Sequence, residues 1–151
     1  MQTRFAKIFG MVLGAALLLS LCACGGNDGQ KAMAGAVAKA AQEALTDVDS
    51  LYSDNFLVFT PGENKTTYVM MGLYYMKDGQ TQDDTALGLF DGDNMTDFAL
   101  KTLNPEDYDA LVDAMPKDNT EEIAKSGLIE EVCKDSGIGT YDQAKKDLGV
   151  S

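Results

Sequence analysis

Thr66-Thr67-Tyr68-Val69-Met70-Met71-Gly72-Leu73-Tyr74-Tyr75-Met76-Lys77 is the stretch that decides the fold of this 151-residue chain. It is the most apolar run after residue 24, and the turn pair Asp78-Gly79 ends it. Its length permits a helix, but the paired threonines, the three tyrosines and the interior glycine favour a β-strand. Because both alternating sets of side chains are apolar, we expect a strand that is covered on both faces.

One of these alternating sets is also a candidate partner surface. It contains Tyr68, Met70, Tyr74 and Met76, and Gly72 leaves a notch between the aromatic side chains. Tyrosine and methionine together make an adaptable apolar surface suited to a peptide, a glycan or a partner protein. The alternative is a central strand with helices over both faces, and the solvent exposure of the four side chains distinguishes the two interpretations.

Other strands are predicted on both sides of this stretch. The pair Pro61-Gly62 ends the strand before it, residues 80–84 form a polar connection after it, and residues 91–94 form a tight turn. Together the strands form an antiparallel meander of three or four members. We expect them at residues 55–60, 66–77, 85–90 and 95–103.

Helices are predicted before and after the meander. Residues 31–49 place small and apolar side chains at three- and four-residue spacing, which indicates an amphipathic helix; a helix lying on a membrane surface is the alternative. Residues 104–115 begin with an Asn-Pro pair, which is typical of a helix start. A third helix is predicted over residues 120–134, and Thr140 with Gln143 forms the capping box of a last one.

The start of the chain has the layout of a secretory signal. Arg4 and Lys7 precede a fourteen-residue apolar run at residues 8–21, whereas a membrane-spanning helix needs about 20 residues. The run ends at Leu21-Cys22-Ala23-Cys24, which resembles the lipobox of bacterial lipoproteins. In that pattern a leucine and two small residues precede the cysteine that is lipidated.

The resemblance implies that residues 1–23 are removed and that Cys24 carries the lipid, a palmitate-type acylation. Cys22 is the competing candidate, but it would place Leu21 directly before the cleavage point, where the pattern has a small residue. The protein would then be attached to the cell membrane on its extracytoplasmic face. An ordinary cleaved signal and an uncleaved anchor are the alternatives.

After the signal we expect a lipidated cysteine with a flexible spacer at residues 24–30, and one domain at residues 31–151. The 128 residues that follow cleavage suit one hydrophobic core. Strands followed by helices define the α+β class. Cys133 is then the one cysteine left besides Cys24, so we expect it in the core, with intermolecular disulfide pairing as the alternative.

Composition excludes several functions. The chain has 12 Lys and Arg against 24 Asp and Glu, and it has no histidine and no tryptophan. Its negative charge disfavours nucleic acids and anionic lipid head groups, so membrane affinity must come from the lipid. Without histidine, Ser-His-Asp and Cys-His mechanisms and His-ligated zinc are excluded.

One acidic turn is a weak metal candidate. Asp91, Asp93, Asn94 and Asp97 could supply oxygen ligands to calcium, although Thr96 stands where an EF-hand loop needs glycine. A solvated turn between two strands is the alternative.

We therefore expect a lipid-anchored envelope protein that acts as a noncatalytic binding or interaction module. No cofactor is expected, and the partners are the membrane, through Cys24, and a protein or glycan of the envelope. The alternative is an enzyme that uses carboxylates alone on a cell-surface glycan. That alternative predicts two acids converging in a cleft, one of them with a raised pKa.

Overall fold

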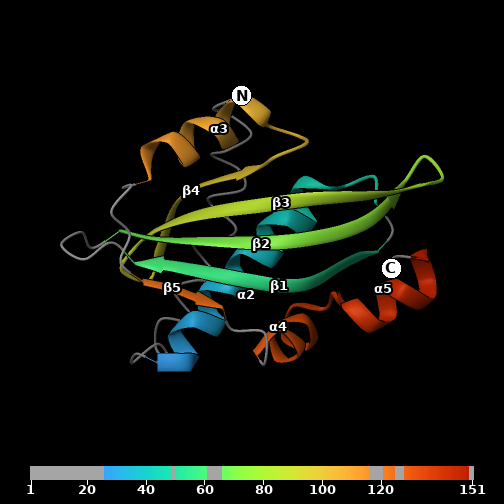
Figure 1. Ribbon diagram of the computed structural model, residues 1–151, viewed down its shortest axis with the longest axis horizontal. Coiled ribbons are helices and arrows are strands. Elements are labelled where there is room, and N and C mark those ends of the chain that lie inside the picture. Colours follow the sequence, from blue (N-terminus) through green and yellow to red (C-terminus); the bar gives the residue numbers. More distant parts are fainter. Residues whose placement is uncertain (1–25, 49, 61–65, 116–120, 125–127, 150–151) are drawn as a thin grey trace.

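The computed structural model describes residues 26–48, 50–60, 66–115, 121–124 and 128–149 (Figure 1). The predicted α+β class is confirmed, with an N-terminal helix, an antiparallel meander and C-terminal helices. In chain order the elements are α2 (Gly26–Ala44), β1 (Leu51–Thr60), β2 (Thr66–Lys77), β3 (Gln80–Asp91), β4 (Asn94–Leu100), α3 (Pro105–Ala114), β5 (Glu121–Ala124), α4 (Ile129–Ser136), β6 (Gly139–Thr140) and α5 (Tyr141–Leu148).

β2, the strand formed by the opening stretch, lies in the middle of the sheet, whose strand order is β4-β3-β2-β1-β5. All neighbours in that order are antiparallel, and the short β6 pairs with β1 in parallel. Asp78 and Gly79 both have positive φ angles, 52° and 75°, as in the two-residue hairpin turns that match strand twist. Pairing of β2 with β3 therefore begins directly at Lys77 and Gln80.

α2 covers one face of the sheet, and Figure 1 shows it running behind the strands. The β2 side chains on this face are at most 3% exposed. Six α2 residues are at most 1% exposed, and five of them are alanines, which let the helix approach the strands closely. The apolar stripe of this helix therefore belongs to the protein core and does not lie on a membrane surface. The buried β2 residues on this face are Val69, Met71, Leu73 and Tyr75.

The other face of the sheet is covered at its two ends. α3 packs over β3 and β4, where Tyr108 and Leu111 join the strand residues Tyr68, Leu87 and Ala99 in a second buried cluster. α5 lies at the opposite end, against β1, β2 and β6 (Figure 1). The expectation that both faces of β2 are covered is therefore met only in part.

The helix predicted over residues 120–134 is wrong in its first part. Glu121–Ala124 forms β5, which pairs with Leu57–Thr60 of β1, and α4 begins only at Ile129. Without β5, this part of β1 would be a sheet edge with a row of unpaired backbone groups, and pairing satisfies them. Pairing with β1, a strand that is distant in the sequence, therefore outweighs the local helix propensity of these residues.

Several predicted boundaries also differ from the structure. β1 begins at Leu51 instead of residue 55, β4 ends at Leu100 instead of residue 103, and α2 ends at Ala44 instead of residue 49. Residues 80–84, predicted as a polar connection, belong to β3, because the tight turn lets them pair with β2. α2 begins at Gly26, so residues 26–30 are helical although the sequence placed them in a spacer. An ion pair of 3.3 Å between Lys31 and Glu131 ties this first part of α2 to α4. No helix within the described ranges is long and apolar enough to cross a membrane.

Candidate functional site

The four residues of the predicted partner surface lie on one face of β2, but they are exposed unequally. Tyr68 is only 4% exposed because α3 covers it, and its hydroxyl donates a hydrogen bond to the Ala114 carbonyl at 3.3 Å. Met70 and Tyr74 are half-buried, and Met76 is 42% exposed. The surface is therefore closed at its Tyr68 end and open at its Met76 end.

The notch predicted at Gly72 is filled. β1 contains a bulge between Ser53 and Asn55, and the bulge brings Asp54 over Gly72. A Cβ atom on Gly72 would lie 2.7 Å from Asp54 Oδ1 and 3.0 Å from Asn55 Oδ1. The interpretation of Gly72 as space for a ligand is wrong, because two polar side chains of the neighbouring strand occupy that space.

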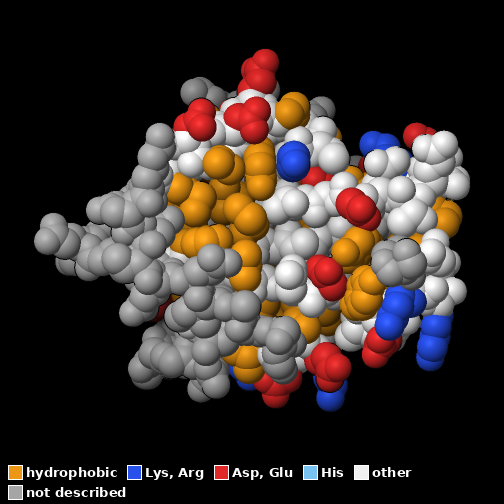
Figure 2. Space-filling view, viewed as in Figure 1, with side chains coloured by type: hydrophobic (Ala, Val, Ile, Leu, Met, Phe, Trp, Pro, Cys, Tyr) orange, Lys and Arg blue, Asp and Glu red, His pale blue; other side chains and the backbone are white. Residues whose placement is uncertain are grey.

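Tyr74 is held in place by its neighbours. Its hydroxyl donates a hydrogen bond to Asp54 Oδ2 at 3.0 Å, and its ring centroid lies 5.8 Å from that of Tyr141 on α5. Burial, with the Asp54 carboxylate next in weight, raises the pKa of Tyr74 to about 12. Figure 2 shows hydrophobic side chains gathered over the strands beside α3. Phe59, Met70 and Leu89 are half-buried and pack against the cluster that contains Tyr108 and Leu111 of α3.

The calcium candidates sit in and beyond the β3–β4 turn. Asp91, Asp93 and Asn94 are exposed, whereas Asp97 lies further along β4 and accepts a hydrogen bond from the Phe98 backbone N–H at 2.9 Å. Across the described part of the chain, no group of three or more Asp, Glu or Cys side chains is placed to hold a metal ion. Asp97 thus already uses one carboxylate oxygen as a hydrogen-bond acceptor for the backbone of its own strand.

Cys133 is confirmed as a core residue. It is fully buried on α4, and its Sγ is 3.8 Å from the Ser53 carbonyl oxygen, at the distance of a weak hydrogen bond. Burial raises the pKa of its thiol to about 11, so the thiol is protonated at neutral pH. We assign it no role as a nucleophile, and its burial argues against intermolecular disulfide pairing.

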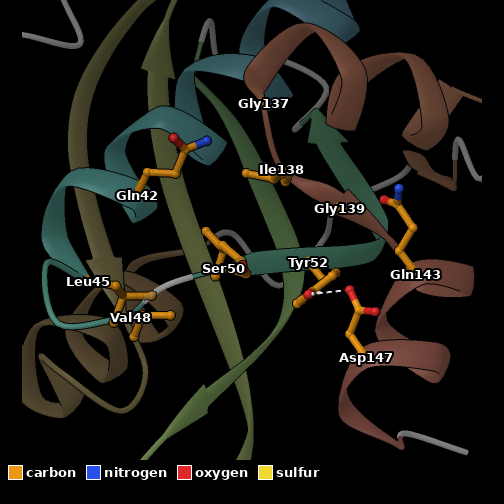
Figure 3. A pocket seen from close by; sticks show the side chains of 11 residues that line it. Gln42, Leu45, Val48, Ser50, Tyr52, Gly137, Ile138, Gly139, Gln143 and Asp147 are labelled. Atoms are coloured by element: carbon orange, nitrogen blue, oxygen red, sulfur yellow. Dashed lines mark hydrogen bonds between the residues drawn. The ribbon is translucent and has the colours of Figure 1, made fainter.

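A cleft that was not predicted lies where α2 ends, β1 begins and α5 packs against β1 (Figure 3). Its volume of about 470 Å³ falls within the range of about 300–1,000 Å³ that is usual for small-molecule sites. The residue before β1 and the segment between α4 and α5 form its opposite walls. The lining side chains that bear on its chemistry are Gln42, Leu45, Ser50, Tyr52, Gln143 and Asp147.

A hydrogen bond across the cleft joins β1 to α5. The Tyr52 hydroxyl donates to Asp147 Oδ2 at 2.7 Å, between residues 95 positions apart in the sequence (Figure 3). Burial, followed by this bond, raises the pKa of Tyr52. The Tyr52 ring lies directly on the backbone of Gly139, where any Cβ atom would collide with it. Glycine at this position therefore lets the ring and α5 come together.

The amide side chains of the cleft are also held in place. Gln42 Nε2 donates to the Ser136 carbonyl at 2.7 Å, and Gln143 Oε1 accepts from the Thr140 backbone N–H at 2.8 Å. The second bond belongs to the capping box that starts α5, which confirms the prediction from the sequence. The polar lining of the cleft is therefore preorganised before any ligand arrives.

A second cavity of about 380 Å³ adjoins the cleft and shares Ser50, Tyr52 and Asp147 with it. Asp47 and Asp78 add two carboxylates to its wall, and Asp47 forms an ion pair of 3.3 Å with Lys77. No lysine or arginine is among the described residues that line either cavity. The described lining of the two cavities therefore presents hydrogen-bonding groups and negative charge, but no cationic side chain, to a ligand.

The carboxylate enzyme predicted as an alternative needs a raised-pKa acid in such a cleft. Desolvation raises the pKa of Asp97, with a smaller contribution from the Asp107 charge. Asp97 is on β4 and lines neither cavity. The structure therefore separates Asp97 from the cleft.

Sequence patterns identified only part of this site. The capping box predicted the helix that carries Gln143 and Asp147, but no pattern indicated that this helix would pack beside Tyr52. Comparisons with protein families, curated proteins and solved structures find no match to this chain. Its function is therefore inferred from its residues and their geometry. Cys22 and Cys24 lie outside the described residues.

Proposed function

We propose that this chain is a noncatalytic binding module, anchored by a lipid on Cys24 to the extracytoplasmic face of the cell membrane. The observation that carries the binding role is the preorganised polar cleft between α2, β1 and α5. The chain has no histidine to act as a general base there. A glycan or a protein of the cell envelope is the partner.

The anchor and the charge of the domain fit together. Loss of residues 1–23 leaves 10 Lys and Arg and 24 Asp and Glu, a net charge of 10 − 24 = −14, which anionic head groups repel. Acyl chains on Cys24 would supply the missing membrane affinity. Because α2 begins two positions later, at Gly26, the domain would be held near the bilayer, with the cleft at the opposite end of α2.

Metabolic labelling with a fatty acid tests the anchor. The Cys24→Ala variant is expected to lose the label, because that residue carries the lipid. Cys22→Ala is the matched control, since it changes the same residue type two positions earlier and is expected to keep the label. Retained labelling in Cys24→Ala would refute the anchor.

Photo-crosslinking in intact cells tests the binding role. A photoreactive amino acid at position 50, where the two cavities meet, is expected to capture an envelope component on illumination. The same amino acid at the exposed position 110 on α3 is the control, because α3 lines neither cavity. Equal capture at both positions, or none at either, would contradict a binding role for the cleft. Release of glycan fragments by the purified protein would instead support the carboxylate enzyme.

A further inference from the structure

We infer that the cleft binds an uncharged oligosaccharide. This inference rests on the proposed binding function and adds the chemical class of the ligand. The hydrogen-bonding groups of the cleft, its aliphatic side chains and its charge each support this ligand class.

Hydrogen-bonding groups of both kinds line the cleft. The amides of Gln42 and Gln143 each contain a donor and an acceptor, and the Ser50 hydroxyl does so in one atom. Asp147 accepts from Tyr52 through one oxygen, and a carboxylate has further acceptor capacity on the other. Sugar hydroxyls donate and accept at the same atom, so they match such a mixed lining better than a purely acidic or purely basic ligand does.

Aliphatic side chains line the cleft together with these polar groups. Leu45, Val48 and Ile138 line the same cleft, and the last is 9% exposed. Sugar rings are amphipathic, with hydroxyls at the rim and C–H groups on the ring faces. A wall that contains both polar and aliphatic side chains therefore suits a pyranose ring, which can bury its C–H face while its hydroxyls keep hydrogen-bond partners.

Charge restricts the sugar further. The walls of the two cavities contain Asp47, Asp78 and Asp147 and, among their described lining residues, no cationic side chain, so an acidic sugar would meet like charge. The charge is partly compensated, because Asp47 pairs with Lys77 and Asp147 accepts from the Tyr52 hydroxyl. An uncharged oligosaccharide is not repelled by these carboxylates and needs no cationic side chain in order to bind.

Titration calorimetry with the purified full-length chain in a nonionic detergent tests this inference. The probes are a neutral disaccharide of N-acetylglucosamine, its de-acetylated cationic form, and an acidic disaccharide that carries one uronic acid. We expect the neutral probe to bind with a Kd of about 1 mM or tighter, and the acidic probe to bind at least about tenfold more weakly. No binding of the neutral probe at about 10 mM overturns the inference, as does binding of the cationic or acidic probe about tenfold tighter than the neutral one.

Two variants place the binding in the cleft. Ser50→Trp fills the junction of the two cavities from an exposed position and is expected to abolish binding, whereas Ala110→Trp on α3 is expected to leave it unchanged. In Asp147→Asn the asparagine oxygen can still accept the hydrogen bond from the Tyr52 hydroxyl, but the negative charge is removed. The ratio of the Kd values for the acidic and the neutral probe should therefore become smaller. Undiminished binding in Ser50→Trp, or an unchanged preference in Asp147→Asn, contradicts the site. Capture at position 50 in cells without binding of these probes would refute the ligand class and leave the binding module standing.

Discussion

Gly88 on β3 gives the sharpest test of how α2 packs on the sheet. A Cβ atom at this position would lie 2.7 Å from Val37 Cγ2, 3.2 Å from Met95 Sδ and 3.2 Å from Phe90 Cε1. All three neighbours are fully buried, and a valine in a helix has one strongly preferred rotamer, so Val37 cannot turn away. Gly88→Ala is therefore expected to push α2 from the strands and lower the free energy of unfolding by about 1–3 kcal/mol.

Gly35 supplies the matched control within α2 itself. A Cβ atom there would meet its nearest neighbour, Ser136 Oγ, at 3.6 Å, which is an ordinary contact distance. Alanine is favoured over glycine in a helix interior by about 1 kcal/mol. Gly35→Ala should therefore raise the free energy of unfolding by up to about 1 kcal/mol, while the same chemical change at Gly88 lowers it.

Urea unfolding followed by far-UV circular dichroism measures both variants. The expected result is a lower midpoint for Gly88→Ala and a higher midpoint for Gly35→Ala, with the same slope for both, because neither changes the surface exposed on unfolding. A Gly88→Ala variant as stable as the unmodified chain would show that α2 does not press on β3 as described. Two shifts of the same sign would show that glycine flexibility, and not packing, controls both positions.

Three further outcomes follow from buried groups. Asp84→Ala should lower the free energy of unfolding by about 3 kcal/mol. The reason is that the Tyr75 and Thr102 hydroxyls and two backbone N–H groups lose their acceptor. A loss below about 1 kcal/mol, measured by urea unfolding, would contradict this. The pKa of both Tyr74 and Tyr75 is raised from 10.0 to about 12. Their contribution to stability should therefore be constant below pH 10 and fall as the pH rises toward 12. Ultraviolet absorbance should show at least two tyrosines ionising well above pH 10, and ionisation of all tyrosines near pH 10 would refute this. Cys133 should resist iodoacetamide at pH 8 until urea unfolds the chain, and rapid labelling of the folded protein would show that its burial is wrong.

Much of the fold could be predicted from local patterns. The run at 66–77 forms β2 with the expected bounds, because its β-branched and aromatic side chains and the Asp-Gly turn agree. The helix that begins after Asn104 and the capping box at Thr140 are also found as predicted. In each of these segments the residues that decide the structure are neighbours in the sequence.

The predictions fail where segments that are distant in the sequence decide the local structure. β5 forms because part of β1 needs a partner, and four residues carry too little pattern to predict that. The bulge that places Asp54 over Gly72 depends on the register of β1 against β2, which the composition of neither strand reveals. The cleft depends on Tyr52 and Asp147, which are 95 positions apart. Its residues could be seen in the sequence, but their proximity could not.

The most direct test of the central claim is amide chemical-shift mapping of the full-length chain with detergent-extracted envelope material. If the cleft is the binding site, the perturbed signals will include Gly137, Gly139 and Tyr52, which line it. Perturbations confined to Met70 and Tyr74 on the outer face of β2 would contradict that claim and favour the surface predicted from the sequence. A spectrum without any change would contradict binding at both surfaces.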